Sequence, residues 1–316
     1  MSYDPQNLRD RIRSSTQRPQ GSQTADQPAA AAAYFDFSVV PPDDVTDNGS
    51  RTWWVRGQNF VLAFCWAAEG EVFTRTEQKD EYVVLVPRAG TQVRAAADVG
   101  PDADIEGPAL LIMPPGASEL EVHGGGPVIR LFTTESEDLV ARCRNQEDYA
   151  EPHAHVAPLI AWPEPADGHR IRAYRIADHP YEPTRFGRLF RCSTFMVNWF
   201  DPDQGPRDPG ALSPHLHDDF EQCSLALEGS YVHHIRSPWT SSLSDWRDDD
   251  HRLVASPSIA IIPPPALHTS QSVGQVRNHL IDIFCPPRED FSNQDGWVIN
   301  AAEYPRPDLE DEETGP

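Results

Sequence analysis

Short apolar segments separated by Gly, Pro and Asp run through most of this chain from residue 34 onward. Many short apolar segments with turn signals between them are typical of a β-sandwich or a β-barrel. We therefore predict an all-β chain whose strands lie within residues 60–64, 82–87, 109–114, 128–132, 172–176, 190–200, 223–227, 231–235, 258–262 and 279–284.

The two halves of the chain repeat one another. Two copies of one strand pattern indicate the tandem duplication of a single β-domain. The pairs of segments that align without gaps are 108–119 with 257–268, 77–85 with 217–225, and 128–132 with 280–284.

The composition between these segments divides the chain. A polar N-terminal stretch, a Glu-, Pro- and Ala-rich break in the middle and an acidic C-terminal stretch each interrupt the strand pattern. The predicted division is a tail at 1–33, an N-terminal barrel at 34–135, a linker at 136–168, a C-terminal barrel at 169–290 and an acidic tail at 291–316.

The charge narrows the choice of partners. The 316 residues carry a formal charge of −23 with a pI near 4.7, which argues against nucleic acid and anionic membranes as partners. The start of the chain does not have the pattern of a signal peptide, and no apolar run has the length of a membrane span. Five scattered cysteines without a C-x-x-C motif indicate reduced thiols. We expect a cytoplasmic protein with a small-molecule substrate.

Candidate metal-binding chemistry lies in the second half. His215, His217 and Glu221 precede an apolar strand, and alternation along a strand would place all three on one face. His268 follows another apolar strand and a proline turn. Imidazole and carboxylate groups that converge in this way are suitable ligands for a divalent metal ion. We therefore favour a metal site over the alternative that these are surface histidines around a turn. By the same alternation, Gln222 would replace Glu221 only if a bulge shifted the register.

These motifs support a family resemblance. H-x-H-x3-E at 215–221 resembles the first motif of the cupin superfamily, and P-x-P-x-x-H at 263–268 resembles the second, with Pro265 where the family usually has glycine. The resemblance implies two tandem double-stranded β-helix (jelly-roll) barrels, a bicupin. It also implies that His215, His217, Glu221 and His268 hold one divalent metal ion.

The N-terminal half differs at the same positions. Arg75, Glu77 and Glu119 align with the three histidines, and only Glu81 keeps its counterpart. A cluster with an arginine and without imidazole is a poor transition-metal site. We expect a structural or dimerising barrel, with a small polar ligand at Arg75 as the alternative. Because cupin barrels often pair, the resemblance also implies a homodimer.

The resemblance suggests a reaction class. Three imidazoles and one carboxylate would hold a dication at net charge +1 with about two coordination positions open. Such cupins often are dioxygenases, so the expected activity is Fe(II)-dependent oxidation of a small phenolic or enolic acid. The alternatives are a non-redox isomerase or lyase that uses Mn(II), Ni(II) or Zn(II), and a ligand-binding or sensor protein.

Several other residues are candidates for a supporting role. Tyr231 and His233 are candidates for a general base or a supporting hydrogen bond, and strand parity lets only one of His233 and His234 face inward. Cys223 is expected to face the barrel interior as a small hydrophobe. The H-x-H at 153–155 is expected to have no metal role, and the loop at 239–252 either caps the pocket or is solvated.

Overall fold

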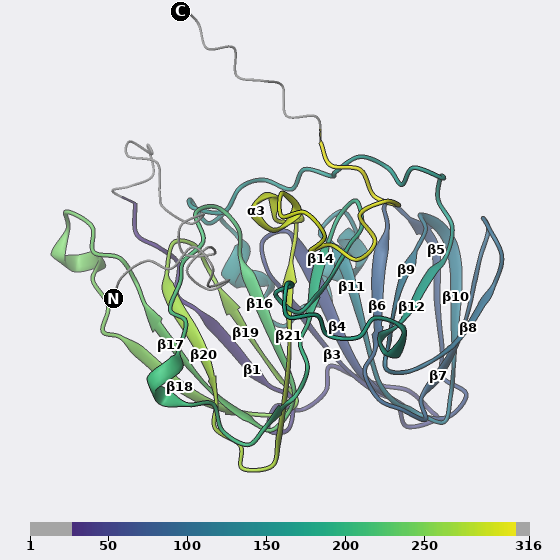
Figure 1. Ribbon diagram of the computed structural model, residues 1–316, viewed down its shortest axis with the longest axis horizontal. Coiled ribbons are helices and arrows are strands. Elements are labelled where there is room, and N and C mark those ends of the chain that lie inside the picture. The colour runs from purple at the N-terminus through teal and green to yellow at the C-terminus, as the bar shows by residue number, and fades with distance from the viewer. Residues whose placement is uncertain (1–26, 308–316) are drawn as a thin grey trace, which may run out of the picture.

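The computed structural model describes residues 27–307, which form two β-barrels side by side (Figure 1). Each barrel consists of one large and one small antiparallel sheet. The prediction of an all-β chain with two barrels is confirmed.

Barrel 1 occupies the right of Figure 1. Its large sheet has seven strands, in the order β12 (Arg172–Arg175), β9 (Ala109–Met113), β6 (Tyr82–Val86), β11 (Gly126–Thr133), β4 (Phe60–Ala67), β3 (Arg51–Arg56) and β2 (Asp44–Val45). Its small sheet has four, in the order β5 (Val72–Gln78), β10 (Gly116–His123), β7 (Gln92–Ala97) and β8 (Ala103–Glu106).

Barrel 2 occupies the left. Its large sheet follows the order β1 (Ala33–Asp36), β19 (Ser258–Ile262), β16 (Gln222–Glu228), β21 (Arg277–Phe284), β14 (Met196–Trp199) and β13 (Arg188–Arg191), and β15 (Asp203–Gln204) also pairs with β21. Its small sheet follows β18 (Asp250–Ala255), β17 (Ser230–Arg236) and β20 (Leu267–Ser272).

The helices of the described residues are short. They are α2 (Glu137–Val140), α3 (Glu289–Ser292) and the 3₁₀ turns η1 (Gln146–Tyr149), η2 (Ile176–Asp178), η3 (Pro209–Ala211) and η4 (Leu243–Asp245). Within residues 27–307, no helix is long and apolar enough to cross a membrane.

The barrels exchange one strand each. β1 pairs with β19 of barrel 2, and β12 pairs with β9 of barrel 1. The predicted division at residues 34 and 169 assigned most of β1 to the N-terminal barrel and β12 to the C-terminal barrel. In the structure each of these strands completes the large sheet of the other barrel. The exchange covers backbone groups that would otherwise form an open sheet edge.

The main apolar core lies between the barrels. The two large sheets contribute alternate residues to it, for example Leu62 and Phe64 from β4 and Leu225 and Ile283 from barrel 2. Each such buried side chain contributes roughly 1.5–3 kcal/mol. Cys223 also lies in this core. Its predicted place inside barrel 2 is wrong, because Gln222 is the first inward residue of β16 and alternation turns Cys223 outward.

The barrel interiors differ at one matched position. Arg130 of barrel 1 aligns with Asp282 of barrel 2 in the repeat. The Arg130 guanidinium carbon lies 3.9 Å from the centroid of the Phe73 ring and 5.3 Å from that of Trp54. Burial lowers the pKa of Arg130 to about 10, so the group stays charged at neutral pH. Barrel 1 is thus filled by apolar side chains and a stacked arginine.

A matched pair of buried glutamates joins the barrels. Glu81 accepts hydrogen bonds from the Ser193 backbone N–H at 3.1 Å and from the Tyr304 hydroxyl at 2.8 Å. Glu221 accepts from the Gln58 backbone N–H at 2.6 Å and from the Tyr149 hydroxyl at 3.0 Å. In each case the carboxylate reaches a turn between two strands of the other barrel, at Gln58 or Ser193, and a tyrosine that follows β11 or β21 in the chain. We call this pair the reciprocal clasp.

The clasp also revises the predicted C-terminal tail. Tyr304 is 1% exposed and Trp297 is 3% exposed, so residues after 291 pack into the fold. The chain from 308 to 316 lies outside the described residues.

We predict that Glu81→Ala lowers the free energy of unfolding by about 3 kcal/mol, because the Ser193 N–H and the Tyr304 hydroxyl lose their buried acceptor. Urea denaturation followed by fluorescence measures the change. Glu77→Ala, an exposed change on β5, is the matched control and should cost less than about 0.5 kcal/mol. Equal losses in the two variants would contradict a stabilising role for the clasp.

Candidate metal centre

Three histidines meet at one end of barrel 2. His215 and His268 form an isolated antiparallel bridge, with N–H to O distances of 3.0 and 2.8 Å in the two directions. His217 follows two residues later. One ring nitrogen from each of the three histidines lies within 4.8 Å of the others. The structure thus brings together three of the four residues predicted as metal ligands.

Backbone carbonyls orient two of the rings. His215 Nδ1 lies 2.9 Å from the Ser213 carbonyl oxygen, and His268 Nδ1 lies 2.9 Å from that of Ala266. A ring nitrogen facing a carbonyl oxygen carries the proton, so Nε2 of each ring keeps its lone pair. This is the tautomer that a metal-binding histidine needs.

Gln222 is the fourth residue of the cluster. Its side-chain oxygen lies 2.8 Å from His217 Nε2 and 3.4 Å from His268 Nε2. Its amide nitrogen donates to Ser224 Oγ at 2.9 Å and to Asp282 Oδ1 at 3.1 Å. Because Asp282 and Ser224 hold the nitrogen, the oxygen of Gln222 is turned toward the imidazoles.

Glu221 does not reach the histidines, so its predicted place in the cluster is wrong. The chain bends at Asp218 and Asp219, and β16 begins only at Gln222. Strand alternation therefore does not run from His217 to Glu221. The bend turns Gln222 inward and sends Glu221 to the reciprocal clasp.

Burial keeps the three histidines neutral. It lowers the pKa of His215 to about 4 and the pKa values of His217 and His268 well below their ordinary value, and the nearby Arg288 charge acts in the same direction. His217 Nδ1 is buried without a hydrogen-bond partner among the described residues. Such an atom has lost its hydration without a replacement. Three neutral imidazoles and one neutral amide oxygen fit a divalent metal ion.

The positions in barrel 1 that align with the histidines do not converge. Arg75 pairs with both carboxylate oxygens of Asp138, at 2.6 and 3.1 Å. A register shift in β10 between Gly116 and Ser118 reverses the parity of the strand. Glu119 consequently faces solvent, as Glu77 does, while Ser118 turns inward and contacts the Tyr82 hydroxyl at 2.9 Å.

Both predicted proton-transfer residues lie on the inner face of β17. Tyr231 and His233 are buried, whereas His234 points outward to His251. His233 Nδ1 lies 2.8 Å from Ser270 Oγ, and its Nε2 is buried without a hydrogen-bond partner among residues 27–307. Burial lowers the pKa of His233 to about 4. Their catalytic role remains a prediction.

The linker histidines and the long loop lie apart from the cluster. His153 Nδ1 lies 3.5 Å from Glu221, in the clasp, and His155 contacts the Gln27 carbonyl at 2.8 Å. In the loop, the rings of Trp239 and Trp246 stack on each other with centroids 4.1 Å apart. A cavity of about 130 Å³ opens beside His268, and of this loop only residues near its end, such as Asp249, line it.

Sequence reasoning placed Gln222 in the cluster only if a bulge shifted the register, and it missed Ser224 and Asp282. A signal was present, because Gln222 and Ser224 are polar at alternate positions of an otherwise apolar strand. Asp282 is likewise the one charged residue within the apolar segment 280–284. A buried carboxyl group in such a segment needs a partner on the same face.

Comparison with known proteins extends the view of the fold. No family profile matches the sequence, and no curated protein matches it. Among solved structures, Lactobacillus farciminis oxalate decarboxylase in a formate complex aligns at 13% identity with a TM-score of 0.56, covering 84% of this chain and 89% of that one. Bacillus subtilis oxalate decarboxylase at pH 4.6 aligns at 13% identity with a TM-score of 0.53, covering 83% and 78%. At this identity the likeness establishes the fold.

We predict that His215→Ala or His268→Ala abolishes stoichiometric binding of a divalent metal, because each change removes one neutral nitrogen ligand. Elemental analysis of protein purified without an affinity metal column measures this. Glu221→Gln should keep the metal and lose stability, and the outward His234→Ala is the matched control. Full metal content in both ligand variants, or metal loss in Glu221→Gln, would contradict the assignment.

We also predict that the metal-free protein loses stability as the pH falls from about 6.5 to 4. Burial lowers the pKa values of His233 and His279 to about 4, whereas unfolded histidine titrates near 6.5. Between these values the unfolded state binds more protons, so falling pH favours unfolding, by at most about 3 kcal/mol per residue. Urea denaturation across this range should show a smaller pH slope for His279→Gln than for His123→Gln, a control at a half-buried surface position. Equal slopes would contradict the prediction.

Proposed function

We propose that this chain, a bicupin by its fold, is a metal-dependent lyase that removes CO₂ from a small carboxylic acid without net oxidation. The observation that carries the proposal is the neutral set of donors at the candidate metal centre. His215, His217, His268 and Gln222 together contribute no charge.

A neutral donor set changes the electrostatics of the site. With Glu221 as a ligand, the centre would have had a net charge of +1, whereas with Gln222 it keeps the full +2 of a dication. The carboxylate of Asp282 accepts an amide hydrogen from Gln222 and contacts none of the three histidines directly. In a buried site of low dielectric constant, the uncompensated charge attracts an anionic substrate strongly.

The protein groups would divide the work. The three histidines and Gln222 would hold the metal, while Ser224 and Asp282 would fix the Gln222 amide. A bound divalent ion would act as a Lewis acid that polarises an oxygen of the substrate.

Decarboxylation breaks the bond from carbon to the carboxylate and forms a C–H bond, so the site must deliver one proton. His233 would relay it, since one of its ring nitrogens contacts Ser270 and the other has no partner among the described residues, and Tyr231 lies on the same face of β17.

The comparisons support a lyase over the dioxygenase expected from sequence. Both solved structures with the higher TM-scores are oxalate decarboxylases, and one of them contains formate. Their activity belongs to those proteins, but it favours a small mono- or dicarboxylic acid as the substrate class here. No comparison supports iron or an oxygenase reaction, so Fe(II)-dependent dioxygenation is the competing outcome of the assay, and ligand binding without turnover is the third.

The test is a coupled measurement of CO₂ release and O₂ uptake with a panel of small carboxylic acids, on protein whose metal has been identified. We expect metal-dependent CO₂ release without net O₂ uptake, and none in His268→Ala. Gln222→Glu should retain the metal yet raise KM for the anionic substrate roughly tenfold, since the centre loses one positive charge. Stoichiometric O₂ uptake, or an unchanged KM in Gln222→Glu, would contradict the proposal.

A further inference from the structure

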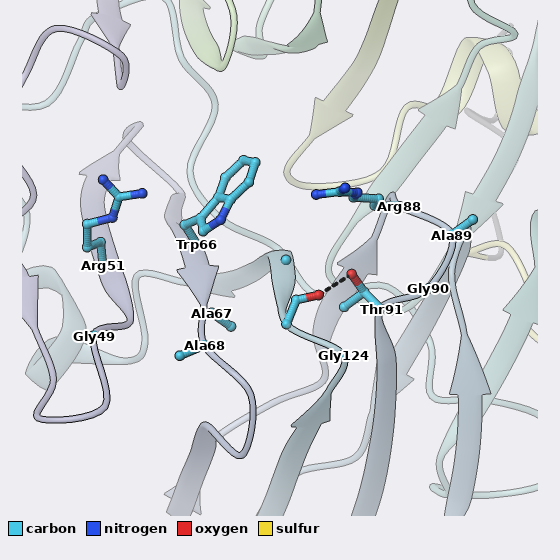
Figure 2. A pocket seen from close by; sticks show the side chains of 12 residues that line it. Gly49, Arg51, Trp66, Ala67, Ala68, Arg88, Ala89, Gly90, Thr91 and Gly124 are labelled. Atoms are coloured by element: carbon cyan, nitrogen blue, oxygen red, sulfur yellow. Dashed lines mark hydrogen bonds between the residues drawn. The ribbon is translucent and has the colours of Figure 1, made fainter.

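A second hollow, of about 430 Å³, opens on barrel 1 (Figure 2). It lies where β4 and β6 end and β11 begins. The candidate metal centre is in the other barrel, barrel 2. Its walls come from the start of β3, the end of β4 and the turns at 88–91 and 124–126. The volume is in the range of small-molecule sites.

Two arginines give this hollow a positive charge. Arg51 and Arg88 line it, and no acidic side chain does. Of the arginines within residues 27–307, only these two and the stacked Arg130 have neither a hydrogen bond nor a carboxylate partner. Arg51 has only a cation–π contact, with its guanidinium carbon 6.0 Å from the centroid of the Trp53 ring. In a chain with a net charge of −23, two guanidinium groups without a carboxylate partner in one hollow form a local anion site.

The nearest carboxylates are already engaged by the turns. Glu69 accepts a hydrogen bond from the Gly124 backbone N–H, and Glu106 accepts one from that of Gly90 at 3.1 Å. These contacts stabilise the turns that line the hollow, and neither carboxylate forms an ion pair with Arg51 or Arg88 among the described residues.

An exposed indole lies between the two charges. Trp66 is 39% exposed and stands directly opposite Arg51 across the β3–β4 pair. In Figure 2 its ring stands between the Arg51 and Arg88 side chains. An exposed indole face favours stacking with a planar ring.

Glycine turns form walls of the hollow whose shape is fixed before a ligand binds. Gly90 and Gly124 have φ values of +84° and +77°, and a Cβ on Gly124 would lie 2.1 Å from the Gly90 carbonyl oxygen. Thr91 Oγ1 donates to the Gly125 carbonyl at 2.6 Å, which ties the two turns together. Preformed walls reduce the conformational entropy that the protein loses when a ligand binds.

We propose that this hollow is a binding site for a small aromatic carboxylate. One of the two guanidinium groups pairs with the carboxylate while Trp66 stacks on the ring, and the other adds to the positive potential of the hollow. The site is independent of the metal centre and of the lyase activity proposed for it.

The test is calorimetric titration with benzoate at low ionic strength. We expect saturable binding by the wild-type protein, and affinity roughly tenfold lower in Arg51→Gln or Arg88→Gln, since each change removes one of the two positive charges of the hollow. Trp66→Ala should also bind more weakly, and neutral benzamide should bind the wild type poorly. Arg94→Gln, an exposed arginine that pairs with Asp102 outside the hollow, is the matched control and should bind as the wild type does.

Three results would overturn the proposal. They are no saturable benzoate binding by the wild type, equal affinity in the double variant of Arg51 and Arg88, and loss of benzoate binding in His268→Ala. The last would place benzoate at the metal centre instead. Thermal unfolding of each variant shows whether it is folded.

Discussion

The burial of both large sheets on both faces is the constraint on which the rest of the structure depends. One face of each sheet fills its own barrel, and the other packs against the neighbouring barrel. A one-residue change of parity therefore moves a side chain between two buried environments instead of between core and solvent. At the start of β16 the parity of the strand decides which side chain can meet the histidines. Gln222 points into barrel 2, and Glu221 points into the interface between the barrels.

The two repeats share the reciprocal clasp between the barrels and differ in the barrel interiors. Glu81 and Glu221 each accept a backbone N–H and a tyrosine hydroxyl from the opposite barrel. Both repeats have a glutamate at this position because each glutamate makes the reciprocal contact. The shared glutamate is therefore not evidence for a metal ligand. Arg130 and Asp282 share one position in the repeat, yet one stacks on Phe73 and the other orients Gln222.

Much of the fold followed from local patterns in the sequence. Alternation, turn residues and the internal repeat predicted two β-barrels, and the spacing around His215 and His268 predicted three converging imidazoles. The errors arose where parity changed without a strong sequence signal. The bend at Asp218 reversed the faces expected for Glu221 and Cys223. The exchange of β1 and β12 depends on tertiary pairing, which an apolar strand does not encode by itself.

The strand exchange has a consequence for how such a chain could arise. Reciprocal transfer of the first strand of each half is the geometry of a two-fold dimer whose identical subunits swap an N-terminal arm. Fusing two such subunits keeps every pairing and removes the requirement that both copies stay the same. One copy is then free to keep its histidines while the other gives them up.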